Sequence, residues 1–270
     1  MQKFQEKMKL FYDNEVINWH EHVWFNADRS GLNWAHCDKL VESVNAMGID
    51  KTVVSNPVTW DRYCKPEDFR FANDTVLEAI KKYPKELAGM CFVNAGWRDE
   101  AIAEIQRCYD AGMLGIKLYH QYFINDTVLF PIIEKCIELD IPILVHAGKL
   151  TVNPLEQPHI SDGTHFADVA KRYPDAHFIM AHITGGGDWQ WQLRAIRDCK
   201  NVVTDMSGSV CDRPVLEQTV ATLGAERLLF GTDISVGPCV GKMLCADLSE
   251  EDKKTILAGT AYQRFLRKGV

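Results

Sequence analysis

The stretch Ile143-Leu-Val-His-Ala-Gly148 decides the fold of this chain. Its first three residues are apolar and do not alternate with polar ones, which is typical of a parallel strand buried on both faces. A histidine and a glycine then end the strand. Phe178-Ile-Met-Ala-His-Ile-Thr-Gly-Gly-Gly187 follows the same order. Strands of this kind, each followed by a helical pattern, predict the α/β class.

The same unit, a short apolar strand followed by an amphipathic helix, recurs along the chain. Strands are predicted at 16–22, 51–56, 87–94, 115–119, 142–146, 177–182, 202–206 and 227–232. Helices are predicted at 37–47, 72–82, 100–111, 127–139, 162–172, 189–199, 214–223, 249–258 and 261–267. Eight such units that close on themselves predict a (β/α)8 barrel. An open doubly wound sheet is the alternative, but no Gly-x-Gly-x-x-Gly follows the first strand.

Length and composition indicate one domain. The chain has 270 residues, of which 46% are hydrophobic, and no linker, low-complexity stretch or charge block divides it. We therefore expect residues 1–270 to form a single barrel, a fold that takes about 250 residues. Residues 1–13 are expected to be an N-terminal extension, with a short amphipathic helix over 1–11.

Composition also limits the classes of partner and compartment. The formal net charge of −7 argues against a nucleic-acid surface. No apolar run reaches the roughly 18 residues of a membrane helix, and the N-terminus lacks the apolar core of a signal peptide. The nine cysteines are scattered without a Cys-x-x-Cys pair, which favours reduced thiols and a cytoplasmic location. A small-molecule substrate is expected, and homo-oligomerisation is left open.

Polar side chains stand where the predicted strands end. They are His20, His22, Lys117, His146, His182 and Asp233. His20 and His22 lie two apart on a strand, so both can face one metal ion while Glu21 points the other way. Singly, a strand-end histidine usually donates to a carbonyl, and a strand-end aspartate often caps a helix. Their coincidence at the carboxyl ends of barrel strands predicts a metal site instead.

These motifs resemble the amidohydrolase superfamily, and more narrowly the amidohydrolase-2 branch of TIM-barrel hydrolases. The resemblance runs from residue 20 to about residue 265 and rests on His-x-His, Val-His-Ala-Gly, Ala-His before a glycine run, and Phe-Gly-Thr-Asp, in that order. It implies one or two divalent metal ions, zinc being expected before manganese or iron. The implied metal ligands are His20, His22, His146 and Asp233. His182 would bind a second metal or the substrate, and Lys117 would bridge two metals if carbamylated.

The chain departs from the family pattern at two positions. The family usually has Asp two residues before the first histidine, where this chain has Asn18, which removes a charged group that could affect metal affinity. The family often has Pro after Lys-Leu-Tyr, where this chain has His120. That histidine is expected to add a titratable group beside the site.

The chemistry expected from the resemblance is hydrolysis of an amide, a lactone or another ester. A divalent metal lowers the pKa of bound water toward about 7. Asp233 is expected to take the proton of that water and pass it to the leaving group, and His182 or the metal to stabilise the oxyanion. The alternative is a lyase of the same branch, a metal-dependent non-oxidative decarboxylase of an aromatic or conjugated acid. A metal-binding barrel without catalysis is a third interpretation.

Five residues in the connections after strands are candidates for contact with the substrate. They are Trp24, Arg62, His120, Lys149 and His159. Arg62 could bind a substrate carboxylate through its forked guanidinium, and His159 lies in a long connection of the kind that is often functional. Loop aromatic residues are more often packing residues, and Arg62 and Lys149 could equally be solvated.

Overall fold

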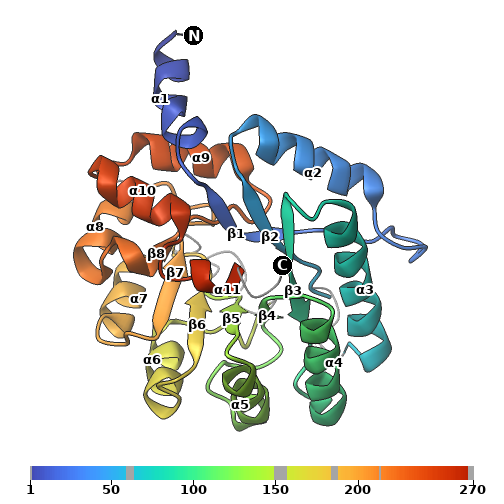
Figure 1. Cartoon of the computed structure of the whole chain (residues 1–270). Helices are drawn as coiled ribbons and strands as arrows, with labels where there is room; N and C mark the ends of the chain where they lie inside the picture. The colour runs from blue at the N-terminus through green and yellow to red at the C-terminus, as the bar shows by residue number, and fades with distance from the viewer. Residues whose placement is uncertain (1, 59–63, 149–156, 184–187, 213, 267–270) are drawn as a thin grey trace.

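Eight parallel strands in sequential order form the sheet of this protein, a computed structural model that describes residues 2–58, 64–148, 157–183, 188–212 and 214–266. The last strand returns to the first, because the backbone N–H of Trp19 donates to the carbonyl of Phe230 at 2.8 Å and that of Asp233 to His20 at 2.8 Å. Figure 1 shows the helices arranged around these strands. The predicted (β/α)8 barrel is therefore confirmed.

The strands lie where the sequence predicts them but most are shorter. They are β1 Ile17–His22, β2 Lys51–Ser55, β3 Leu87–Phe92, β4 Gly115–Leu118, β5 Pro142–Val145, β6 His177–Met180, β7 Val202–Asp205 and β8 Leu228–Leu229. His146, His182 and Asp233 lie just beyond the ends of β5, β6 and β8, at the rim of the barrel. His20 and His22 lie within β1, and Lys117 lies within β4.

The helices are α1 Gln2–Tyr12, α2 Trp34–Ala46, α3 Pro66–Lys82, α4 Arg98–Asp110, α5 Phe130–Leu139, α6 Gly163–Arg172, α7 Trp189–Ile196, α8 Val215–Leu223, α9 Val236–Cys245, α10 Glu250–Ala258 and α11 Gln263–Leu266. The short 3-10 helices η1 Thr127–Leu129 and η2 Ala225–Arg227 precede α5 and β8. α1 matches the predicted leading helix, and Figure 1 shows its start projecting from the barrel. None of the helices in the described ranges combines the length and the apolar run that crossing a bilayer requires.

Two helix predictions were wrong. α3 begins at Pro66, six residues before the predicted start at 72, because proline suits the first turn, where backbone N–H groups have no partner within the helix. α9 was missed altogether, since Gly237, Pro238 and Gly241 disfavour a helix interior. Pro238 falls in the first turn of α9, where it displaces no helical hydrogen bond.

The amino end of the barrel is filled by apolar side chains. Ile17, Met90 and Ile179 point into the barrel and pack with Tyr262 and Phe265, which close that end around α11. The Tyr262 hydroxyl donates to the carbonyl of Phe178 at 3.2 Å. With that end filled, the polar residues at the carboxyl ends of the strands form the functional end of the barrel.

Candidate metal centre

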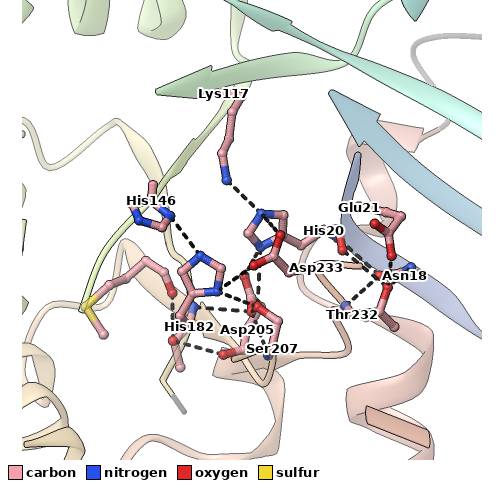
Figure 2. A network of polar contacts seen from close by, with 12 residues as sticks. Asn18, His20, Glu21, Lys117, His146, His182, Asp205, Ser207, Thr232 and Asp233 are labelled. Carbon is pink, nitrogen blue, oxygen red and sulfur yellow. Dashed lines mark hydrogen bonds and ion pairs between the residues drawn. The ribbon is translucent and has the colours of Figure 1, made fainter. Parts of the chain in front are cut away.

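His20, His22 and Asp233 meet at the carboxyl end of the barrel. Figure 2 shows two of them, His20 and Asp233, beside each other. His22 Nε2 lies 3.0 Å from Asp233 Oδ1, and His20 Nε2 lies 3.8 Å from the same oxygen. One ligand atom from each of the three residues lies within 4.8 Å of the other two. The two histidines are buried, whereas the Asp233 side chain is 27% exposed. The triad is thus compact, and Asp233 is its most exposed member.

The remaining nitrogen of each imidazole in the triad has its own partner. His20 Nδ1 donates to Asp205 Oδ2 at 3.0 Å. His22 Nδ1 lies 3.1 Å from the hydroxyl and 3.3 Å from the carbonyl oxygen of Ser55. These bonds hold both Nδ1 atoms and leave both Nε2 atoms facing Asp233, with that of His20 lying closer to Lys117. Metal-binding histidines are oriented in this way, so the residues present fit a divalent cation.

Charge in the triad also suits a cation. Burial, followed by Lys117, lowers the pKa of His20 to about 3, although Asp205 and Asp233 oppose the shift. Burial works against ionisation of Asp233, but the surrounding histidines hold its pKa well below the usual range. A neutral imidazole and an ionised carboxylate are the forms that bind metal.

Lys117 from β4 joins the triad through His20. Its side chain is fully buried, and Nζ donates to His20 Nε2 at 2.7 Å. Burial lowers the pKa of Lys117 to about 8, against the effects of Asp233 and Asp205. The Lys117 ammonium therefore bonds to the same Nε2 atom of His20 that would coordinate a metal ion. The carbamylation implied by the resemblance stays a prediction.

A second group of side chains stands beside the triad and contains the other two predicted histidines. His182 Nε2 lies 3.0 Å from His146 Nδ1, and His182 Nδ1 lies 2.8 Å from the Ser207 hydroxyl. His146 Nε2 faces Gln157 Oε1 at 2.9 Å. The Asp233 Oδ2 atom is 3.6 Å from His182 Nδ1. His182 thus borders the triad, while His146 lies one residue farther away, and its role as a ligand remains a prediction.

Asn18 does not face the triad. Its Nδ2 donates to the Thr232 hydroxyl at 2.7 Å, and its Oδ1 accepts the backbone N–H groups of His20 at 3.2 Å and Thr232 at 3.1 Å. This amide needs both a donor and an acceptor, which a carboxylate at the same place would lack. In this chain, residue 18 joins β1 to the segment after β8.

Sequence reasoning missed several polar partners, of which Ser55 beside His22 is described above. Asp205 ends β7 and accepts from His20, and Ser207 follows it and donates to Asp205 through both its backbone N–H and its hydroxyl. The rule that found the other strand-end residues would have found Asp205, which ends the apolar run after Val202. Gln157 has no such signal, because it lies in a long connection.

The candidates for substrate contact are placed unequally. The Trp24 ring centre lies 5.3 Å from that of His22, and the His120 ring lies 6.1 Å from His146. His159 stands against Phe123, with ring centres 5.3 Å apart, and no described contact links it to the triad. Arg62 and Lys149 lie outside the described residues. Tyr119, which was not predicted, has its ring 4.3 Å from His146.

The model of the amidohydrolase family Amidohydro_2, described as amidohydrolase, matches residues 46–265. A 2-amino-3-carboxymuconate-6-semialdehyde decarboxylase of Dictyostelium discoideum is 24% identical, covering 84% of this chain and 75% of the relative. A 2-keto-4-carboxy-3-hexenedioate hydratase of a Sphingobium species is 21% identical, covering 78% and 72%.

Solved structures show the same fold. The 2,6-dihydroxybenzoate decarboxylase from Rhizobium has a TM-score of 0.74 at 18% identity and covers 95% of this chain and 100% of its own. A 5-carboxyvanillate decarboxylase from Novosphingobium aromaticivorans, solved with manganese, has a TM-score of 0.70 at 18% identity and covers 93% and 96%. At this level of identity, the likeness extends to the fold alone.

Proposed function

This chain belongs to the amidohydrolase family, and from that premise we propose that it is a metal-dependent non-oxidative decarboxylase of a small aromatic or conjugated carboxylic acid. The observation that carries the proposal is the triad of His20, His22 and Asp233, in which hydrogen bonds hold both Nδ1 atoms and direct both Nε2 atoms toward one carboxylate. The names of the relatives add the reaction type, since the Dictyostelium protein and the dihydroxybenzoate enzyme are both decarboxylases.

The cation is proposed to be held by the triad. Bound there, it would supply positive charge to a substrate oxygen and so stabilise the electrons left behind when the carboxyl group departs. The sequence leads us to expect zinc first, and the solved structure with manganese makes that ion an equal candidate. Asp205 and Ser55 contribute by fixing the orientation of the two imidazole rings. The rings therefore would not need to rotate when the metal binds.

Proton delivery falls to the protein. When a carboxylate leaves as carbon dioxide, the carbon that carried it must gain one proton. Asp233 and His182 are the titratable side chains that face each other at the exposed edge of the triad, 3.6 Å apart. The low pKa of Asp233 keeps it ionised at neutral pH, so it must first take up the proton that it delivers. We therefore assign it the role of taking a proton from substrate or water and returning it to that carbon, with His182 as its partner.

Substrate orientation is assigned to the aromatic side chains beside the triad. Trp24 lies against His22, and Tyr119 lies against both His120 and His146. Rings at these positions would pack on a flat, conjugated acid. Trp24 and His120 therefore keep the substrate-contact role predicted for them. For Arg62, Lys149 and His159 that role rests on the sequence.

Hydrolysis, the reaction expected first from the sequence, has less support. The same triad could activate water toward an amide or ester. However, the two relatives and two solved structures reported above are named as decarboxylases and a hydratase rather than hydrolases. The hydratase makes addition of water to a conjugated acid the second candidate. It would use the same two groups, since hydration also adds one proton to carbon.

One experiment separates these reactions. The purified protein, loaded separately with Mn²⁺ and Zn²⁺, is incubated with hydroxybenzoic acids, conjugated dicarboxylic acids, lactones and amides. Release of carbon dioxide is followed together with the ultraviolet spectrum of each acid. We expect carbon dioxide from at least one aromatic or conjugated acid, and release that is about 10²- to 10⁴-fold slower from the Asp233→Asn variant. Hydration or hydrolysis without release of carbon dioxide would overturn the proposal.

A further inference from the structure

The segment that carries Asp233 is held in an unfavourable backbone conformation. Asp233 has a φ of 41° and Ile234 a φ of 61°, both in the left-handed region that L-residues rarely adopt. Ile234 is branched at Cβ, for which that region is especially costly. Its side chain is 66% exposed, so packing offers little in return. Hydrogen bonds to this turn must therefore hold it in place.

The backbone N–H groups of Thr232 and Asp233 donate to the carbonyl of His20, and Glu21 supplies two further bonds to the turn from the opposite face of β1. Its Oε1 accepts the backbone N–H of Ile234 at 2.8 Å and that of His22 at 2.9 Å. Its Oε2 accepts the Thr232 hydroxyl at 2.5 Å. Figure 2 shows Glu21, Thr232 and Asn18 grouped on the side away from His146 and His182. One carboxylate thus bonds to the residues immediately before and after Asp233.

The Glu21 side chain is expensive to bury. It is 1% exposed, and within the described ranges its hydrogen bonds come from two backbone amides and a hydroxyl rather than from a cation. A buried carboxylate without a countercharge costs free energy that an apolar side chain would not. Its position between His20 and His22 ties the turn directly to the strand that carries both ligands.

We propose that Glu21 is the positioning residue for Asp233, holding the turn at residues 232–234 so that the Asp233 carboxylate faces His20 and His22. This rests on the proposed function insofar as the triad binds a metal ion, but not on the reaction catalysed there. Residues that orient metal ligands from behind typically change metal affinity by 10- to 100-fold. Glu21 acts through Asp233 and is not expected to touch the substrate.

The test is the dissociation constant of Mn²⁺, measured by titration calorimetry at 25 °C on the purified protein. Glu21→Leu keeps the volume but removes every acceptor, and we expect Mn²⁺ to bind about 10- to 100-fold more weakly. Glu21→Gln keeps an oxygen that can accept both backbone N–H groups. It should therefore bind Mn²⁺ within about threefold of the wild type.

Two further variants separate positioning from a general loss of stability. Glu104→Gln alters another buried carboxylate, between α3 and α4, that has no contact with the triad, and it should leave Mn²⁺ affinity unchanged. Glycine adopts positive φ without strain. The double variant Glu21→Leu, Ile234→Gly should therefore bind Mn²⁺ several-fold more tightly than Glu21→Leu alone. Ile234→Gly by itself should change the Mn²⁺ affinity of the wild type by less than about threefold.

The outcomes are distinct. Wild-type Mn²⁺ affinity in folded Glu21→Leu protein would overturn the proposal, as would equal losses in Glu21→Leu and Glu104→Gln. If Glu21→Leu does not fold, Thr232→Val is compared with Asn18→Ala, because the Thr232 hydroxyl bonds to Glu21 Oε2 and also accepts from Asn18 Nδ2. Weaker Mn²⁺ binding in Thr232→Val than in Asn18→Ala supports the proposal, and equal or tighter binding overturns it. If the wild-type protein binds Mn²⁺ but releases no carbon dioxide, the proposed reaction fails while this inference stands. If it binds no Mn²⁺, both fail.

Discussion

Among the described residues, two regions have the composition of a metal site, yet only one is prepared to bind a cation. The first holds the triad of His20, His22 and Asp233 and the overlapping group of His20, His182 and Asp205. The second is the cluster of Cys91, Glu104 and Cys108 between β3 and α4. In the second, Glu104 Oε1 accepts from Arg107 Nη2 at 2.6 Å and from Asn73 at 2.9 Å, and Oε2 accepts from Arg107 Nε at 2.8 Å. A guanidinium already occupies the place of a cation.

Burial acts on the two clusters in opposite directions. It lowers the pKa of His20, which keeps the imidazole neutral and able to bind metal. It raises the pKa of Cys91 well above the ordinary thiol value, which keeps the thiol protonated and unable to do so. Residue type and proximity alone therefore do not make a metal site. Whether a cluster can bind a cation depends on the partners of each ligand atom and on the protonation state of each ligand.

Replacement of Asp233 should give the largest effect. Asp233→Asn removes the charge of the triad and the proposed proton carrier, and we expect turnover to fall by about 10²- to 10⁴-fold. Circular dichroism should show an intact barrel, because the side chain is partly exposed. Carbon dioxide release and metal content are the measurements. Turnover close to that of the wild type would remove Asp233 from the mechanism.

Replacement of Asp205 should give the next largest effect, because it removes the hydrogen bond that orients His20. The thiols of the second cluster have no such role. Asp205→Ala leaves His20 Nδ1 without the acceptor now at 3.0 Å. We expect metal affinity to fall by about 10- to 100-fold. Calorimetric titration with Mn²⁺ checks this, and Asp188→Ala, at the start of α7, is the matched control. Equal affinities in the two variants would contradict the orienting role of Asp205.

Replacement of Glu104 should affect stability and not metal content. Glu104→Gln weakens the contact with Arg107, whose side chain is 29% exposed, so solvent reduces the loss. We expect the free energy of unfolding, measured in urea, to fall by about 1–2 kcal/mol. Metal content, measured by elemental analysis after Mn²⁺ loading and desalting, should match the wild type. A lower metal content would show that the second cluster also binds a cation.

The smallest effect is expected at a carboxylate that belongs to neither cluster. Asp162 caps α6 and accepts from Thr164 and His165. The His165 hydrogen bond, against the effect of burial, holds the Asp162 pKa well below its usual range. Its stabilising contribution is complete above the unfolded pKa of about 3.9 and is lost as the pH falls below it. Asp162→Ala should cost about 1 kcal/mol at pH 7.

The pH dependence checks the sign of this last prediction. Urea unfolding of the wild type and of Asp162→Ala is compared at pH 7 and at pH 3. The difference between the two proteins should narrow at pH 3, where protonation of Asp162 begins to remove the same contribution from the wild type. A difference that widens on acidification would mean that the native state raises this pKa rather than lowering it.

The barrel itself could be predicted, because short apolar strand patterns alternate regularly with amphipathic helix patterns. This alternation can be seen in the sequence without knowledge of the tertiary contacts. α9 could not, since Gly237, Pro238 and Gly241 make its local preference unfavourable. Packing overrides that preference, with Cys239, Val240 and Met243 buried in the core. Local sequence thus predicted the elements whose own pattern is strong and missed the one that tertiary contacts stabilise.

By itself, the sequence determined which residues would stand at the carboxyl end of the barrel. Strand periodicity places His20 and His22 on one face and Glu21 on the other, and strand order brings Asp233 next to them. Only the tertiary structure decided what each group does there. It set His146 against Gln157, gave His20 the acceptor Asp205, and bent the chain at Asp233 and Ile234. Hydrogen-bond partners and burial come from segments far apart in the chain, so no local pattern encodes them.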